Sequence, residues 1–375
     1  MADAATEADV QEAVVEFEAA YRLADPPSSI VTGMLALALS RRAHFLRPYE
    51  DLDRIVELAQ QAAVQREIDR GIEPDVSVLE ADARLLRHRR FGWVDDLQQA
   101  IAIFEALGPL VTRPGVEPSG GSDLDAFLLS QPERVGSHQV DYAAALQTRY
   151  ELLGDPADID TAITIFQSAF RNLDETRWST HPGTLSRIAA ALMARYWRDG
   201  ARADLDQTIA LRERSVSTSS TPDRIELNRR ASLGHTLVRR GCEDGDQAEI
   251  SRGIHLLEDA AERAPRAMRR AADPLNLAEA LLDWLEHGGD PALLARASRL
   301  VDEADSFEMQ ASTVGFQLHL SARVSWHQFE RSGDPRDALA ARRAIEDSLA
   351  LTAPAHRDRP QRMAFLEMVE RSVAG

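Results

Sequence analysis

One helix-pair pattern recurs seven times along this chain. One position of the pattern is occupied in turn by Leu52, Leu97, Ile159, Leu205, Ile250, Leu294 and Ala338, which lie 45, 62, 46, 45, 44 and 44 residues apart. Sixteen residues before these markers stand Ala36, Ala81, Ala143, Ala189, Gly234, Ala278 and Ala322. Small side chains at one register let helix backbones approach closely, and a fixed period of this size is typical of a solenoid. The sequence therefore predicts an all-α solenoid of about seven helix pairs.

The third copy, residues 141–170, shows the anatomy of one pair most clearly. Its second half carries an apolar stripe at three- and four-residue steps, formed by Ile159, Ile163, Phe166 and Phe170. Gly154 predicts the end of the first helix, because glycine readily adopts the left-handed conformation needed there. Asp155 and Pro156 then suit the N-cap and the first position of the second helix. The same Gly-Asp-Pro sequence recurs at 289–291 and 333–335.

An acidic column directly precedes the markers. Its members are Asp51, Asp96, Asp158, Asp204, Glu249, Leu293 and Asp337, so six of the seven are acidic. A carboxylate at the start of a helix is stabilised by the positive end of the helix dipole. Asp-x-Asp motifs at 51–53, 158–160 and 204–206 resemble metal or nucleotide-sugar motifs when each is taken alone. Their shared register favours helix-start electrostatics instead, and we expect no metal site.

In this form the repeats resemble tetratricopeptide repeats of the actinobacterial type, whose motifs have the form ALxxRYxxxGDPADLDxAI. The two central copies match it best, with Ala145-Leu146, Arg149-Tyr150, Gly154-Asp155-Pro156-Ala157-Asp158-Ile159-Asp160 and Ala162-Ile163 in one, and Ala191-Leu192, Arg195-Tyr196, Gly200, Ala203-Asp204-Leu205-Asp206 and Ile209 in the other. The resemblance covers about residues 30 to 375 and implies a right-handed superhelix. The period exceeds the usual ~34 residues of this repeat, which implies longer helices.

The family resemblance also bears on activity. Such arrays often precede a CHAT domain, a caspase-like cysteine peptidase module. No such module follows in this sequence, so peptidase activity is not expected from the resemblance.

The pattern divides the chain into segments. Residues 1–28 are expected to hold a lone second helix, 29–107 the first two pairs, 134–356 the other five, and 357–375 a capping helix. Residues 108–133 are rich in Gly and Pro and interrupt the rhythm; loops this long are often functional or disordered. This insertion is either tolerated at the edge of the solenoid or serves as a lid that contacts a partner. At the C-terminal end, either Met363, Phe365 and Met368 cap the array or another chain covers it.

Composition excludes several functional classes. A formal net charge of −18 argues against binding nucleic acid or an anionic membrane surface. All 43 basic residues are arginine, so there is no lysine to form a Schiff base or to complete a Walker loop. No apolar run is long enough to span a bilayer, and the acidic N-terminal sequence lacks the features of a signal peptide. We expect a cytoplasmic protein that uses no cofactor.

The sequence offers no catalytic or metal-binding constellation. The single cysteine, Cys242, lies seven residues after His235, about 10 Å along a helix, which is too far for a catalytic pair. We interpret Cys242 as a stray or half-buried thiol. His319 and His327 lack the third protein ligand that zinc needs. We therefore expect no enzyme activity.

The family resemblance implies a binding face. In tetratricopeptide repeats the first helix of each pair lines a concave groove, at positions −3, +1, +4 and +5 from the small column. These offsets select His319, Arg323, Trp326 and His327 in the seventh pair, Glu279 and Asp283 in the sixth, His235 and Arg239 in the fifth, Gln147 in the third and Asp82 in the second. Trp and Arg are favoured binding anchors. Trp326 has a second interpretation, as a side chain that covers the seam between two helices.

Two functions fit these observations. The first is a scaffold whose concave groove binds a protein or peptide. The negative net charge of the chain predicts that this partner carries basic residues. The second is a sensory or regulatory arm of a CHAT-type peptidase, or of another effector, encoded on a separate or truncated chain. The sequence does not indicate an oligomeric state.

Overall fold

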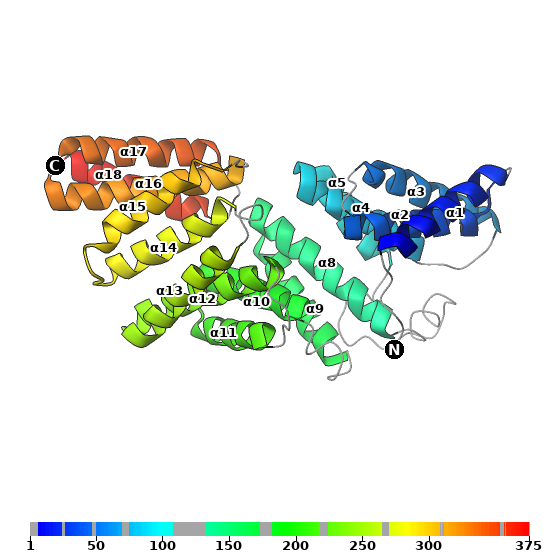
Figure 1. Ribbon diagram of the computed structural model, residues 1–375, viewed down its shortest axis with the longest axis horizontal. Coiled ribbons are helices and arrows are strands. Elements are labelled where there is room, and N and C mark those ends of the chain that lie inside the picture. The colour runs from blue at the N-terminus through cyan, green and yellow to red at the C-terminus, as the bar shows by residue number, and fades with distance from the viewer. Residues whose placement is uncertain are drawn as a thin grey trace. The chain divides into compact units, whose positions relative to one another are not determined.

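The computed structural model describes residues 7–24, 27–46, 50–69, 75–107, 132–172, 182–217, 224–264, 270–307, 309, 311–352, 356 and 358–374. These residues form sixteen α-helices (Figure 1). In chain order they are α1 Glu7–Leu23, α2 Ser29–Leu46, α3 Asp51–Asp69, α4 Asp75–Phe91, α5 Val94–Ala106, α8 Pro132–Leu153, α9 Pro156–Asn172, α10 Pro182–Asp199, α11 Arg202–Ser217, α12 Arg224–Asp244, α13 Gln247–Arg263, α14 Ala272–Glu286, α15 Leu293–Ala304, α16 Ala311–Ser332, α17 Pro335–Ala350 and α18 Arg359–Ala374. The predicted all-α class is confirmed.

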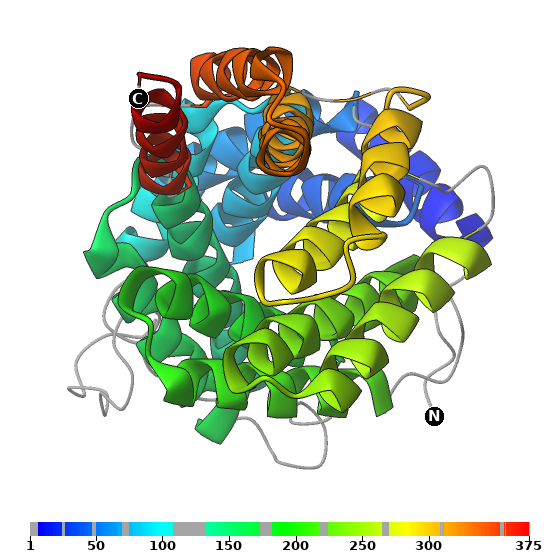
Figure 2. The same ribbon diagram turned by 90° about the vertical axis from the view of Figure 1, so that its left-hand side faces the viewer.

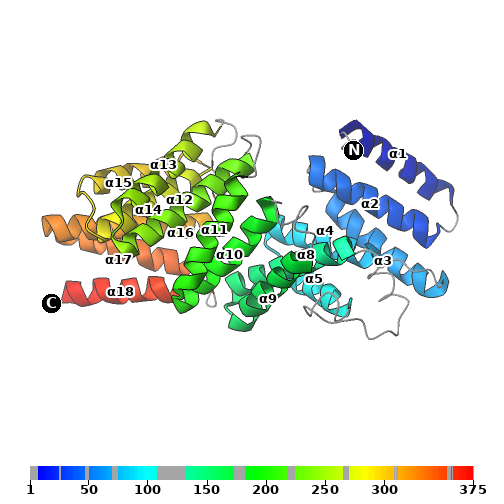
Figure 3. The same cartoon turned by 90° about the horizontal axis from the view of Figure 1, so that it is seen from below.

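The helices follow the predicted repeat. The seven small-column residues lie in α2, α4, α8, α10, α12, α14 and α16, and the seven markers lie in α3, α5, α9, α11, α13, α15 and α17. Consecutive helices pack side by side, as α10 with α11, α12 with α13 and α16 with α17 (Figure 3). We call the members of each pair the first and the second helix. The helix α1 precedes the pairs and α18 follows them.

Two compact units divide the chain. Unit 1 comprises Met1–Arg149 and Asp160–Asp174, and unit 2 comprises Tyr150–Ile159 and Glu175–Gly375. In unit 1 the helices from α1 to α5 pack in succession. In unit 2 those from α10 to α18 do so, and first helices also contact each other, α12 with α14 and α14 with α16.

The small column lies where helices approach closely. All of its residues are buried, as are the seven markers. A methyl group at Gly234 would lie 2.5 Å from the carbonyl oxygen of Gly253, and one at Gly253 would lie 2.5 Å from that of Gly234. Real side chains do not tolerate such a distance, so α12 and α13 touch through their backbones. This confirms the role assigned to the column.

A second column of small residues lines the opposite side of these contacts. It lies three residues after each marker, and all its members are buried: Ile55, Ala100, Ala162, Thr208, Gly253, Ala297 and Ala341. Six of the seven are small. The second helix thus presents its own small face, which the sequence analysis did not identify.

The turns within pairs have the predicted chemistry. Gly154 has a φ of 74°, in the left-handed region where glycine carries no steric penalty. The Asp155 carboxylate accepts a hydrogen bond from the Ala157 backbone N–H at 2.9 Å, as an N-cap does. Asp246 and Asp334 accept equivalent bonds at the starts of later second helices, and Asp290 accepts one from Ala292 in the turn before α15. Glycine ends one helix and aspartate starts the next because each satisfies a local backbone requirement.

The acidic column has a further role. Arg42 donates hydrogen bonds to Asp51 at 2.6 and 2.7 Å, and Arg240 pairs in the same way with Glu249, nine residues later. These bonds tie the end of a first helix to the start of its second helix. The dipole interpretation was therefore incomplete, because these carboxylates also bind an arginine.

Beyond the last pair, α18 packs against α17 (Figure 2, dark red and orange). Phe365 and Met368 pack against Trp326, Ala341 and Val369, whereas Met363 keeps 46% of its surface exposed. Almost all of the Gly/Pro-rich insertion at 108–133 lies outside the described residues. Within the described parts of the chain, no helix has the length and apolar character that crossing a membrane requires.

Candidate binding face of unit 2

The first helices of unit 2 bring predicted groove residues from neighbouring repeats into contact. His235 on α12 lies with Nε2 at 2.7 Å from Oε2 of Glu279 on α14. Arg323 on α16 donates a hydrogen bond from Nη2 to Oδ1 of Asp283 on α14, at 2.7 Å. The members of these two pairs are 44 and 40 residues apart in sequence, close to one repeat. These four predicted residues therefore share one face.

Arg323 and His327 extend this network along α16. Arg323 also donates to Oε1 of Glu286, from Nε at 3.0 Å and from Nη2 at 2.8 Å. His327 lies between two carboxylates, with Nδ1 at 2.9 Å from Glu330 and Nε2 at 3.3 Å from Glu286. The side chain of Arg323 is 7% exposed, whereas those of Glu286 and Glu330 are 38% and 50% exposed. The guanidinium thus lies at the base of the network and the carboxylates lie at its rim.

At the other end of this face, Arg239 on α12 contacts α10. Its Nε donates to the hydroxyl of Tyr196 at 3.1 Å and to Glu243 at 3.0 Å. The Tyr196 hydroxyl in turn donates to Glu243. The guanidinium of Arg239 also lies over the ring of Trp197, 4.7 Å from its centroid, in a cation–π geometry. The first helices α10, α12, α14 and α16 are therefore connected by polar contacts along one side.

Sequence reasoning missed five residues of this face: Tyr196, Trp197, Glu243, Glu286 and Glu330. They lie seven to nine positions after the small column, one helical turn beyond the offsets used in the prediction. Those offsets belong to the shorter family repeat. In helices as long as α12 and α16, with 21 and 22 residues, the same face continues for another turn. Extending the offsets by four residues finds Glu286 and Glu330.

Two carboxylates of this face, Glu279 and Glu286, have lowered pKa values, and two of its histidines favour the charged form. Loss of solvent lowers the pKa of His235, but the charge of Glu279 and the bond to it outweigh this and raise that pKa above its ordinary value. The pKa of His327 is raised in the same way, through Glu286 and Glu330. Burial raises the pKa of Glu286, but His327 and Arg323 lower it further, to about 2. These shifts all favour the charged forms, so each histidine and its carboxylate partner stabilise each other as an ion pair.

Two predicted residues, His319 and Trp326, lie deeper in unit 2. Both side chains are buried, at 7% exposure each. Burial, together with the charges of Arg323 and Arg362, lowers the pKa of His319 to about 4, so this ring is neutral at pH 7. It makes an edge contact with Phe365 on α18, with centroids 6.0 Å apart. A partner's contact with these two rings stays a prediction.

A pocket of about 610 Å³ adjoins the rim carboxylates. It lies where the end of α14, the second half of α16 and α18 meet. Its apolar walls are Leu285, Pro291, Trp326, Phe365 and Met368, and its polar walls include Glu286, His327, Glu330 and Arg331. A mostly apolar hollow edged by a few charged groups is the usual form of a side-chain binding pocket.

The remaining predicted residues, Asp82 on α4 and Gln147 on α8, belong to unit 1. Both are partly exposed on first helices. They stay predictions of binding residues and are not members of the network of unit 2.

The thiol of Cys242 and the possible metal ligands near this face bear on whether catalysis could occur there. Cys242 is buried, and burial followed by the charge of Asp283 raises the pKa of its thiol to about 12, so the nucleophilic thiolate does not form near neutral pH. Among the described residues, no three His, Cys, Asp or Glu side chains are arranged to hold a metal ion.

No protein-family model matches the chain, and no curated protein matches it. Solved structures resemble it at low identity. The C-terminal part of a TPR repeat-containing protein from Cytophaga hutchinsonii is 14% identical, with 87% of this chain and 99% of that one covered and a TM-score of 0.40. A circular tandem repeat protein with a novel repeat topology is 15% identical, with 98% and 89% covered and a TM-score of 0.28.

Proposed function

We propose that this protein is a binding scaffold and that the first-helix face of unit 2 holds a protein or peptide segment with basic side chains. The observation that carries the proposal is the gradient of exposure across the network: Arg323 is 7% exposed at its base, whereas Glu286 and Glu330 are 38% and 50% exposed at its rim. An approaching partner meets carboxylates first. Arginine or lysine side chains would complement this rim.

Rigidity of the face supports the proposal. Ion pairs between neighbouring repeats, such as His235 with Glu279 and Arg323 with Asp283, fix these side chains before any partner arrives. A face that is already ordered loses less conformational entropy on binding, and solenoids use such surfaces for recognition. The pocket beside Trp326 and Phe365 suits the apolar stem or ring of a side chain next to the basic one.

Synthetic peptides test the proposal directly. An array of 12-residue peptides carries one Leu or Trp flanked by Arg and Lys, and matched sets replace the basic residues with Gln or with Glu. We expect the full chain to bind the basic set, and to bind it less as salt rises from about 0.05 to about 0.5 M. The double variant Glu286→Gln/Glu330→Gln should bind at least about tenfold more weakly.

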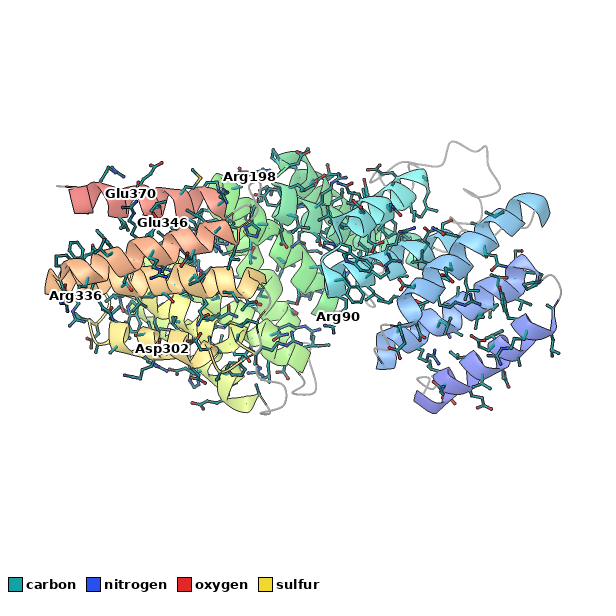
Figure 4. All side chains as sticks on the ribbon, turned by 90° about the horizontal axis from the view of Figure 1, so that it is seen from above. Arg90, Arg198, Asp302, Arg336, Glu346 and Glu370 are labelled. Carbon is teal, nitrogen blue, oxygen red and sulfur yellow. The ribbon has the colours of Figure 1, made fainter. Side chains whose placement is uncertain are left out.

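A matched control is Asp302→Asn. Asp302 is exposed on the second helix α15, so this variant loses one negative charge at a distance from the pocket, against two lost in the double variant (Figure 4). Its affinity for the basic set should equal that of the wild type, and circular dichroism should show both variants folded. Equal binding of the basic and glutamine sets by the wild type, or full binding by the double variant, contradicts the proposed face.

The second candidate function, a sensory arm of an effector encoded on another chain, would use the same scaffold. In that case the segment bound at this face belongs to the effector, and the peptide experiment identifies its charge.

A further inference from the structure

One core position of the repeat is apolar in every helix pair except the fourth. It lies seven residues after each marker, and its members are Ala59, Phe104, Phe166, Arg212, Leu257, Val301 and Ile345. The six apolar members are all buried. Arg212 is the only charged member, and it lies on α11, which packs against α10 and α12. A charge at such a position lowers stability unless a partner of opposite charge neutralises it.

The contacts of Arg212 do not neutralise its charge. Its Nη1 donates to the backbone carbonyl of Ser232 and to the hydroxyl of Thr236, both on α12 and both uncharged. Glu213, the next residue on α11, pairs instead with Arg252 on α13, at 2.9 Å. No carboxylate among the described residues binds Arg212. Burial lowers the pKa of its guanidinium to about 10, so the group is still charged near neutral pH.

One edge of the Arg212 guanidinium has no acceptor in the part of the chain that the structure describes. Arginine carries five N–H groups, and both hydrogen bonds to α12 come from Nη1. Nε and Nη2 do not belong to the fully buried polar atoms that lack a partner, so this edge meets solvent. Ser232, on the helix that Arg212 contacts, is likewise exposed. The Nε–Nη2 edge is therefore open to a ligand.

Other arginines of this chain hold carboxylates with the same edge. Arg195 binds Asp204 through Nε and Nη2, and Arg42 binds Asp51 in the same way, at distances of 2.6 to 2.8 Å. The planar guanidinium and the planar carboxylate form two parallel hydrogen bonds, which add geometric specificity to the attraction of charge. The edge that Arg212 exposes thus has the geometry of a carboxylate site.

Arg212 lies beside the candidate binding face of unit 2. Thr236, which accepts its hydrogen bond, directly follows His235 of that face on α12. The first helices α12, α14 and α16 pack directly against one another, whereas α10 and α12 are not among the closely packed pairs. A position that breaks the pattern of its repeat at a cost in stability is where a functional residue is expected.

We propose that Arg212 is a carboxylate-binding residue, whose Nε and Nη2 hold the two oxygens of an Asp or Glu side chain on the protein segment that binds this face. The inference rests on the proposed function and adds an acidic residue to the partner. The basic residues of the segment meet Glu286 and Glu330, about two helix spacings or ~16–20 Å away. An extended chain covers ~3.3 Å per residue, so the acidic residue should lie about five or six residues from the basic ones.

Acetylated and amidated 12-residue peptides test this inference, because side chains are then their only charged groups. Each peptide carries one Leu flanked by Arg and Lys, and a single Glu at a spacing that varies along the series. Matched peptides carry Gln or phosphoserine in place of Glu. We expect the full chain to bind the best-placed Glu peptide about tenfold more tightly than its Gln counterpart. Arg212→Leu and Arg212→Gln should abolish this preference and keep the affinity for the Gln peptide.

The variant Arg212→Leu also separates a binding role from a structural one. Leu257 occupies the same position in the next repeat and is buried, so leucine should fit on α11 as well. If the arginine serves binding, its replacement should raise the Tm, because an unpaired charge leaves the core. The control Arg299→Gln removes an exposed arginine from α15, and it should keep both the wild-type Tm and the preference for Glu.

Three results would overturn the inference. Equal binding of the Glu and Gln peptides by the wild type excludes a carboxylate site. A preference for Glu that persists in Arg212→Leu, with a lowered Tm, assigns the arginine a structural role. Tighter binding of the phosphoserine peptide than of the Glu peptide, lost in Arg212→Leu, identifies a phosphate as the occupant.

Failure of the proposed function gives a different result. In that case the wild type does not bind the basic peptides, or Glu286→Gln/Glu330→Gln binds them fully. A peptide with one Glu and no basic residue then measures Arg212 by itself. Binding that Arg212→Leu loses supports the carboxylate site even without the basic contacts, and absence of such binding overturns it together with the proposed function.

Discussion

Arg195 donates two hydrogen bonds to the carboxylate of Asp204, from Nε at 2.8 Å and from Nη2 at 2.7 Å. The two residues are nine positions apart and join the end of α10 to the start of α11. Paired bonds of this kind fix orientation as well as distance, because the planar guanidinium matches the carboxylate. Arg42 with Asp51 repeats the arrangement at the same separation. The bond thus belongs to the repeat.

Arg195→Gln is expected to lower the free energy of unfolding by about 1–2 kcal/mol. The side chain of Asp204 is 7% exposed, so its carboxylate loses a charged partner in a setting with little water. The Arg195 side chain is 28% exposed, which keeps the loss below that of a fully buried pair. Urea denaturation monitored by circular dichroism measures the difference, and an unchanged midpoint would show that the bond contributes nothing.

An apolar pair should substitute for this ion pair. In the sixth repeat the equivalent positions are Trp284 and Leu293, which are both partly buried and both pack against the core of unit 2. We therefore expect the double variant Arg195→Trp/Asp204→Leu to be more stable, by about 1 kcal/mol, than the sum of its two single variants predicts. A double-mutant cycle in urea measures this coupling. Strict additivity would mean that the two positions act independently.

Gly234→Ala should destabilise unit 2 although alanine favours helices. The new methyl group would lie 2.5 Å from the carbonyl oxygen of Gly253, and separating α12 from α13 costs about 1–3 kcal/mol. Over most of this range the cost is larger than the ~1 kcal/mol that Gly→Ala gains in an unhindered helix. Ser232→Ala, at an exposed position of the same helix, is the control and should be nearly neutral. A rise in Tm for Gly234→Ala would refute the close backbone contact.

Removing one N-cap is expected to lower the free energy of unfolding less than Gly234→Ala does. The Asp246 carboxylate accepts hydrogen bonds from the backbone N–H groups of Ala248 and Glu249, at 2.9 and 3.1 Å. Asp246→Ala leaves both donors without this acceptor and should cost about 1 kcal/mol. Asp302→Ala removes an exposed aspartate within α15 and serves as the comparison. Equal stability of the two variants would show that the cap is unimportant.

Stability of unit 2 should depend on pH through its histidine–carboxylate pairs. Since the pKa values of His235 and His327 are raised in the folded protein, their contribution is complete below the unfolded value of about 6.5. It is lost as pH rises through the folded values. Glu286 acts in the opposite sense: with its pKa lowered to about 2, its contribution is present above about 4.3 and is lost as pH falls toward 2.

The urea midpoint should therefore be highest near about pH 6.5: above it the contribution of His235 and His327 is lost toward pH 8, and below it His319, whose pKa is lowered to about 4, favours the unfolded state. The double variant His235→Gln/His327→Gln should show a smaller fall over the same range, because it lacks both titrating rings. His255→Gln, on an exposed position of α13, is the control and should keep the wild-type profile. A wild-type midpoint that does not change between pH 6 and pH 8 would contradict the raised pKa values.

The sequence alone determined the helices and their pairing, because these follow from short-range chemistry and from periodicity. Small residues such as Ala189 and Gly234 had to lie at close contacts, since only they allow backbones to approach, and each is buried. Gly154 and Asp155 specified a turn through their own conformational and hydrogen-bonding properties. The shared face of His235 and Glu279 was also predictable, because it depends on helical register.

Only the tertiary structure decided which side chains on that face bind each other and which remain exposed. Glu286 and Glu330 escaped prediction because the face continues for one more turn in longer helices, and Trp326 is buried because α18 packs beside it. Periodicity constrains each helix pair by itself, whereas the exposure and pairing of side chains depend on the atoms that a neighbouring helix places nearby.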